Sequence, residues 1–160
     1  MTPATPSTLH DDPFDLERFI QAQKPVYATV LAELRNARKE THWMWFIFPQ
    51  IAGLGTSTNS RHFAIKNMGE ALAYLQHPIL GQRLARCASE LLARKPRGSK
   101  ALFIKNIFGF PDDMKLHASM TLFDYVSPSE SNVFADVLDA YFQGKPHAES
   151  LELITVLEKK

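Results

Sequence analysis

The chain has 160 residues, a formal net charge of +1 and a single cysteine, Cys87. Its length suits one domain with a sizeable core, and its 45% hydrophobic and 22% charged residues are ordinary for a globular protein. The near-zero net charge argues against a strongly charged surface for binding nucleic acid or membranes. A single cysteine excludes an intramolecular disulfide. No apolar run approaches the about 18 residues that a membrane-spanning helix needs.

Residues 1–11 are rich in proline, threonine and serine, a composition that predicts a disordered lead-in. The stretch has neither a basic n-region nor an apolar h-region, so we do not expect a secretory signal. We expect a cytoplasmic protein in which residues 12–160 form a single helical domain.

The first two helices are predicted before residue 40. Asp12 is an N-cap followed by Pro13 at the first helical position, which predicts a helix through FDLERFIQAQ that Pro25 ends. A second helix is expected over about residues 26–39. Its apolar face consists of Val30, Leu31, Leu34 and Ala37.

Further helices are predicted after an aromatic run and a glycine-rich loop. Helical patterns occupy RHFAIKNMGEALAYLQ and, after His77–Pro78, ILGQRLARCASELLARK. PRGSK is a predicted loop, and ALFIKNIFGF suits either a helix or a strand. Helices are then expected from Pro111 to about Tyr125, up to Gly144 and from about Ala148. The predicted fold class is all-α, a compact single domain of about seven helices in an orthogonal array, with a small strand pair near the aromatic run left open.

The aromatic run THWMWFIFPQIAGLG, residues 41–55, contains both tryptophans of the chain. It suits either a core plug or the wall of a binding site. Aromatic walls with a few polar groups suit a flat ring, and a glycine-rich loop lets backbone N–H groups approach a ligand. His42 is the candidate for proton transfer. The candidate ligand-binding residues are Trp43, Trp45, Gln50, Gly53 and Gly55.

The two tryptophans are expected to have different roles if the run is helical. Residues two apart on a helix point about 200° apart. We therefore predict that one tryptophan packs in the core and that the other lines a pocket.

A second candidate stretch is FGFPDDMKLHASMTLFDY, which contains Lys115 and Ser119 one helical turn apart. A lysine near a helix N-terminus opposes the helix dipole, a conflict that a phosphate or carboxylate ligand would relieve. Pairing of Lys115 with a nearby surface acid is the open alternative. The six histidines are scattered and no nucleotide-binding glycine motif occurs, so we predict no metal and no cofactor.

The third candidate stretch is LERFIQAQK, in which Glu17, Gln21 and Lys24 share one helix face. Helical side-chain pairing is an adequate explanation of this pattern. Alternatively, a half-buried carboxylate would serve as a general base or stabilise an oxocarbenium ion.

Three blocks of the sequence resemble a known family. DPFDLERFIQAQKPVYATVLAELRNARKETHWMWFIFPQIAGLG, YLQHPILGQRL and FGFPDDMKLHASMTLF look like the domain-of-unknown-function family number eighteen-ten, over about Asp12 to Leu153. The resemblance brings no established activity. It implies a compact, mostly helical domain with a site where HWMWFIFPQ meets the PDDMKL block.

A second resemblance concerns ERFIQAQK, HPILGQRL, IFG and MTLF, which are similar to segments of the NADAR family of helical N-glycosidases. Those proteins act on phosphoribosylated riboflavin intermediates or ADP-ribosylated bases. The resemblance implies that Glu17 is an acidic site residue and that Lys24 contacts a phosphate or ribose. The chain departs from that family in having IFGFP in place of a W-G-x-G segment.

Two functions are therefore predicted as alternatives. The first is binding or hydrolysis of a nucleotide-like or phosphoribosylated small molecule, with N-glycosidase activity as its specific form. The second is a non-catalytic helical module whose exposed aromatic patch binds a protein. Convergence of His42, a tryptophan, Lys115 and Ser119 in one pocket would favour the first. We expect a small-molecule partner and no membrane, and the sequence predicts no oligomeric state.

Overall fold

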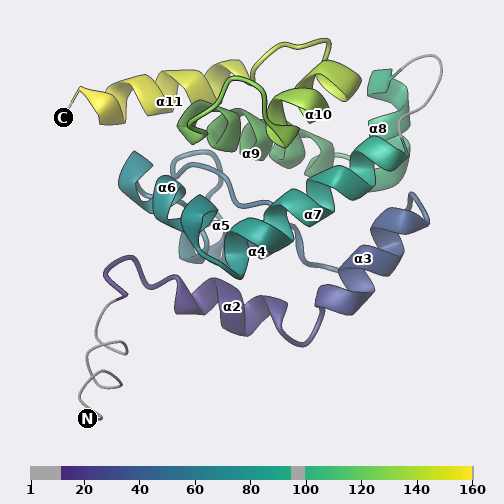
Figure 1. Cartoon of the computed structure of the whole chain (residues 1–160), viewed down its shortest axis with the longest axis horizontal. Coiled ribbons are helices and arrows are strands. Elements are labelled where there is room, and N and C mark those ends of the chain that lie inside the picture. The colour runs from purple at the N-terminus through teal and green to yellow at the C-terminus, as the bar shows by residue number, and fades with distance from the viewer. Residues whose placement is uncertain (1–11, 95–99, 160) are drawn as a thin grey trace.

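Ten α-helices make up the secondary structure of the described chain, which comprises residues 12–94 and 100–159 of this computed structural model, with residues 100–102 described by their backbone only. In chain order they are α2 (Glu17–Gln23), α3 (Tyr27–Arg35), α4 (Met44–Ile47), α5 (Thr58–His62), α6 (Met68–Gln76), α7 (Leu80–Ala93), α8 (Lys100–Phe108), α9 (Asp112–Val126), α10 (Val133–Phe142) and α11 (Ala148–Glu158). The predicted all-α class is confirmed. Figure 1 shows the helices crossing in several directions, with α2 and α3 along one edge and α11 along the opposite one.

The predicted count of about seven helices is wrong, because three further helices lie in stretches without a strong helical pattern. α4 has four residues and α5 has five. Both are far shorter than the about 12 residues that an isolated helix needs in water, so tertiary packing must maintain them. α8 occupies most of the apolar segment that suited either a helix or a strand. An isolated parallel bridge between Ile51 and Ile65 stands where a strand pair was left open.

Two predicted features lie outside the described residues. They are the disordered lead-in, residues 1–11, and most of the PRGSK loop. Within the described part, the buried apolar side chains form one core to which nearly every helix contributes.

α9 is the central helix of this core, and it packs against α4, α6, α8, α10 and α11. Its buried residues are Asp113, Leu116, Ala118, Ser119, Met120, Thr121, Leu122 and Phe123. Such a helix is enclosed on most sides, as expected for one surrounded by other helices. Only its first turn, with Met114 and Lys115, reaches the surface near the aromatic run.

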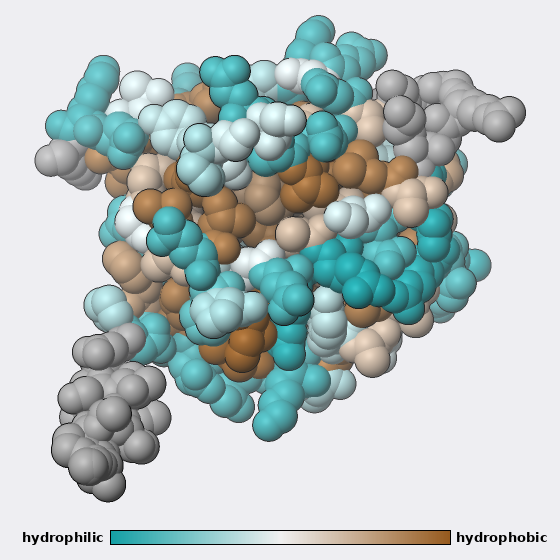
Figure 2. All heavy atoms as spheres, in the orientation of Figure 1, coloured by the Kyte–Doolittle hydropathy of each residue, from teal (hydrophilic) through white to brown (hydrophobic). Residues whose placement is uncertain are grey.

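α7 lies across the face shown in Figures 1 and 2 and packs against α3, α6 and α10. Its buried stripe includes the predicted Leu80, Leu84, Ala88 and Leu91. Gly81 is required where α6 turns into α7, because an added Cβ would lie 1.9 Å from the carbonyl oxygen of Leu75. Figure 2 shows strongly hydrophilic side chains gathered where α7 and α3 lie side by side.

Trp43 and Glu33 form a buried polar contact beside the aromatic run. The Trp43 indole N–H donates to Glu33 Oε1 at 2.9 Å. Glu33 also accepts from the backbone of Glu40 at 2.8 Å and from the Thr41 hydroxyl at 2.7 Å. Burial alone raises the pKa of the Glu33 carboxyl, but these hydrogen bonds together outweigh it and lower the pKa below its ordinary value. The contact fixes the connection between α3 and α4.

Candidate functional site

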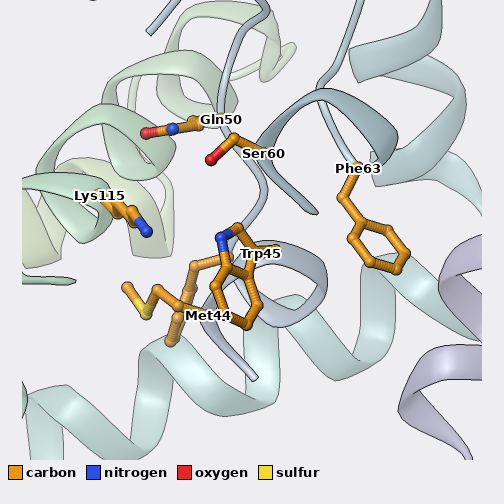
Figure 3. Close-up of a pocket in the computed structure, with 7 residues that line it drawn as sticks. Met44, Trp45, Gln50, Ser60, Phe63 and Lys115 are labelled. Atoms are coloured by element: carbon orange, nitrogen blue, oxygen red, sulfur yellow. The ribbon is translucent and has the colours of Figure 1, made fainter. Parts of the chain in front are cut away.

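A small recess lies beside α4 (Figure 3), and Trp45 lines it whereas Trp43 does not. It has a volume of about 10 Å³, room for the centre of roughly one water molecule. The lining residues are Met44, Trp45, Phe48, Gln50, Ser60, Phe63 and Lys115. They come from α4, the strand-like segment after it, α5 and α9, so the recess exists only in the folded chain.

The polar groups of the recess can all donate hydrogen bonds. Trp45 Nε1 is buried and has no hydrogen-bond partner among the described residues. Figure 3 shows the indole nitrogen, the Lys115 amine and the polar ends of Gln50 and Ser60 around the same small space. Ser60 Oγ accepts from the Ser57 hydroxyl at 2.9 Å, which leaves its own proton for another acceptor. An indole N–H can only donate, and neither the Gln50 carbonyl oxygen nor the Ser60 hydroxyl accepts from it.

The charge at the recess is positive. Lys115 Nζ lies 5.1 Å from the Trp45 ring centroid, within cation–π range. Its nearest carboxylate is Asp112, whose Oδ1 is 3.8 Å away, but the other oxygen of Asp112 lies 2.9 Å from Lys39 Nζ. The pairing of Lys115 with an acid, left open from the sequence, is therefore a long contact to a carboxylate that a second lysine shares.

A larger cavity of about 250 Å³ adjoins the recess and shares Gln50 and Lys115 with it. Its lining residues are Gln50, Leu54, Gly55, Pro111, Met114, Lys115, His147 and Glu149. The first turns of α9 and α11 both contribute, and helix N-termini carry a partial positive charge. The cavity is close to the smaller ligand pockets of proteins in size and combines an apolar wall with a few polar groups.

His147, at the edge of this cavity, caps α11 with its side chain. Its Nδ1 accepts from the Ser150 backbone N–H at 3.3 Å and lies 2.9 Å from the Ser150 hydroxyl. The neighbouring His117 stacks on Phe142 with ring centroids 4.1 Å apart and contacts the His147 ring edge-on at 5.3 Å. Burial lowers the pKa of both histidines, so each is neutral near pH 7.

We predict that stability decreases as the pH falls below about 6.5, the ordinary histidine pKa. The unfolded chain binds protons on His117 and His147 more readily than the folded chain, so acid favours unfolding. Protonated His147 also cannot accept from Ser150. His147→Asn preserves a side-chain cap and should weaken the dependence measured by urea unfolding between pH 7.5 and 5.5. An unchanged pH dependence in this variant would contradict the prediction.

The structure places four of the sequence-predicted site residues together: Trp45, Gln50, Gly55 and Lys115. The others lie elsewhere. Trp43 is in the core, and Ser119 is fully buried within α9 with a hydroxyl that has no partner among the described residues. His42 and Gly53 are exposed, and neither lines the recess or the larger cavity.

Glu17 and Lys24 lie at the exposed surface of α2 and its C-cap and line neither space. Glu17 accepts a hydrogen bond from Gln21 at 2.5 Å, which is the side-chain pairing expected one turn apart. Ser60, Met114, His147 and Glu149 were not among the predicted site residues. Ser60 is the last residue of the predicted loop AGLGTSTNS, whereas the positions of His147 and Glu149 depend on how α11 packs.

Residues 12–94 and 100–159 contain neither a cluster of metal-ligating side chains nor a membrane-spanning helix. No group of three or more His, Cys, Asp or Glu side chains there could hold a metal ion. No helix among these residues is both long and apolar enough to cross a membrane.

The fold and the recess define a compact all-helical protein with a donor-lined, positively charged pocket. The chain belongs to the family described as "Protein of unknown function (DUF1810)", which it matches over residues 13–154. It is also similar to the crystal structure of the conserved hypothetical protein Rv1873 from Mycobacterium tuberculosis, with 44% identity and a TM-score of 0.83 over 90% of this chain and 99% of that one. The comparison with curated proteins gives no match.

Proposed function

We propose that the chain binds a small anionic molecule, nucleotide-like or phosphoribosylated, with an anionic oxygen in the recess and the rest in the larger cavity. The observation that carries the proposal is the buried Trp45 indole N–H, which has no partner among the described residues. A buried donor without an acceptor costs free energy, and an oxyanion in the recess would remove that cost. Lys115 would supply the positive charge, as in many phosphate sites.

The size of the two spaces supports a ligand with a compact body. The recess admits about one oxygen-sized atom, and the cavity of about 250 Å³ continues from it past Leu54 and Met114. A phosphate alone would leave that apolar wall uncovered. A sugar or base attached to the anionic group would cover it.

Hydrolysis of an N-glycosidic bond is the finer form of this proposal. It requires a carboxylate near the ligand to stabilise the developing positive charge. Glu149 lines the larger cavity, whereas Glu17, which the NADAR resemblance implies, does not. Glu149 is therefore the carboxylate that we assign to this role, and Glu149→Gln should retain binding while abolishing release of a base.

The enclosed position of Trp45 favours a small molecule over the alternative of a protein-interaction module. A docking patch for a protein would present its aromatic rings at the surface. Here Trp45 is only partly exposed, and Trp43 is 1% exposed.

The test uses calorimetry and thermal shift with AMP, ribose 5-phosphate, ADP-ribose and the uncharged adenosine. A ligand at about 100 times its Kd adds roughly 2.7 kcal/mol of stability. Lys115→Met should weaken binding of the phosphorylated ligands at least tenfold, about 1.4 kcal/mol. Trp45→Phe keeps the ring but removes the N–H and should cost about 1 kcal/mol of binding.

Lys105→Met is the matched control, because Lys105 is an exposed lysine of α8 that lines neither space. It should bind like the unaltered protein. Adenosine binding as tightly as AMP, or equal effects of Lys115→Met and Lys105→Met, would refute the proposal.

A further inference from the structure

Four arginines gather where α7 lies beside α3, and we call Arg35, Arg83, Arg86 and Arg94 the arginine face. Glu90 is the acidic residue at its centre. It accepts from Arg35 Nε at 3.3 Å and from Arg86 Nε at 3.2 Å, and it lies 3.6 Å from Arg94 Nη2. Figure 2 shows this area as a strongly hydrophilic band. One carboxylate among so many guanidinium groups leaves an excess of positive charge.

The pKa of Glu90 agrees with this arrangement. Desolvation of its carboxyl raises the pKa, but hydrogen bonds from Arg86 and Arg35 and their charges outweigh that effect and lower it. Glu90 is therefore ionised throughout the neutral range, and the excess of positive charge remains after it is counted.

Arg83 differs from the other arginines of the face, because it forms no ion pair with a carboxylate of the described residues. Its Nη1 donates to Gln23 Oε1 at 3.3 Å, and its guanidinium lies 4.8 Å from the Tyr27 ring centroid. Gln23 is itself 1% exposed and donates to the Phe46 carbonyl at 2.7 Å. Arg83 is thus held in place by neutral groups while its charge remains available.

A cavity of about 400 Å³ opens beside Arg83. Its lining residues are Tyr27, Ile79, Gln82, Arg83 and Arg86. It shares no residue with the recess or with the larger cavity of the candidate site. Ile79 is 40% exposed and, with Tyr27, gives the cavity an apolar part next to two positive charges.

We propose that the arginine face is a docking surface for an acidic segment of a partner protein, whose carboxylates pair with the arginines and whose one large apolar side chain enters the cavity. Arg83 lies within α7, and Arg94 is its C-cap eleven residues later. This separation corresponds to about 16 Å along a helix. That distance matches about five residues of extended peptide. Guanidinium groups form paired hydrogen bonds with carboxylates, so the charges are complementary.

A nucleic acid fits the same surface less well. Base stacking on single strands requires aromatic rings with free faces. Arg83 already occupies one face of Tyr27, the aromatic residue of the cavity. The formal net charge of +1 also gives little long-range attraction for a phosphate backbone.

The test measures fluorescence anisotropy of a labelled acidic peptide of glutamate and aspartate residues around one tryptophan. The full chain should bind it with a Kd in the micromolar range. Arg83→Gln with Arg86→Gln should weaken binding at least tenfold, while Arg61→Gln with Lys105→Gln removes the same charge from exposed positions elsewhere and should leave binding within twofold. Gln82→Glu, at an exposed position of the cavity, should also weaken it without loss of folding.

Two comparison probes identify the occupant. A peptide with serine in place of its tryptophan should bind at least fivefold more weakly, and a labelled DNA strand should bind more weakly than the acidic peptide. Equal losses in the two double variants, no effect of Gln82→Glu, equal binding of the serine peptide, or tighter binding of the DNA would each overturn the proposal. None of these measurements depends on the ligand of the Trp45 recess.

Discussion

Replacing Trp43 by alanine is expected to lower the free energy of unfolding by about 3–5 kcal/mol, the range for large-to-small changes at buried aromatic residues. Trp43 is 1% exposed and packs against Phe48 and Phe108, with ring centroids 6.2 Å away in both cases. The change also removes the donor that Glu33 Oε1 accepts at 2.9 Å. Total stabilities of about 5–15 kcal/mol are typical, so the variant should lose a large fraction of the free energy of unfolding. Urea unfolding at neutral pH measures the loss.

Trp45→Ala is the comparison, because it lies two residues away and lines the recess. Its ring is partly exposed and its indole N–H has no partner among the described residues. Its removal should cost less than half as much stability as the loss of Trp43, and it should weaken ligand binding. Equal losses of several kcal/mol in both variants, without any change in binding, would mean that the aromatic run is only a core plug.

The different environments of the two tryptophans follow from local geometry, but their partners do not. Trp43 lies immediately before α4 and Trp45 within it, so their side chains leave the backbone in different directions. That much was predictable from spacing two residues apart. The role of Glu33 was not predictable, because a glutamate on a helix is ordinarily exposed. Here Glu33 is 7% exposed and accepts a hydrogen bond from the backbone N–H of Glu40, in the connection between α3 and α4.

Lys115 and Ser119 show the limit of spacing arguments. Their separation predicts one common helix face, and both do lie on α9. However, α9 enters the core within its first two turns, so Lys115 lines the recess while Ser119 is fully buried. The depth of a helix depends on the other helices around it, which spacing along one helix does not encode.

The remaining site residues come from parts of the chain with no local signal. His147 and Glu149 reach the larger cavity because α11 packs against α9. The family resemblance predicted a site where the aromatic run meets the PDDMKL block, and the recess combines residues of both. Whether that recess binds a ligand remains a prediction.

A second large effect is expected at Arg18 and Glu70, which form the most buried ion pair of the described residues. Arg18 Nη2 lies 2.7 Å from Glu70 Oε2, and the side chains are 6% and 1% exposed. Arg18 also donates to the carbonyls of His62 at 2.8 Å and Ala64 at 3.0 Å. Glu70 accepts from the Lys66 backbone at 2.9 Å. The pair therefore joins α2 to α6, and the carbonyl contacts of Arg18 join α2 to the end of α5 and the segment after it.

Glu70→Ala should cost about 3–5 kcal/mol, because the buried guanidinium of Arg18 would lose its counter-charge. Arg18→Met should cost a similar amount, because the buried carboxylate of Glu70 would lose its counter-charge. The double variant Arg18→Met with Glu70→Leu removes both charges, so its loss should be smaller than the sum of the single losses, a coupling that a double-mutant cycle measures by urea unfolding.

Arg86→Ala is the matched surface control, since Arg86 pairs with Glu90 at 3.2 Å but its side chain is 50% exposed. Such a pair contributes about 0–1 kcal/mol. If Glu70→Ala cost no more than Arg86→Ala, the Arg18–Glu70 pair would be screened by solvent despite its burial, and α2 would be held mainly by its apolar contacts. If the double variant lost as much as the two single variants together, the two side chains would act independently, Arg18 through its carbonyl contacts and Glu70 through the Lys66 backbone N–H.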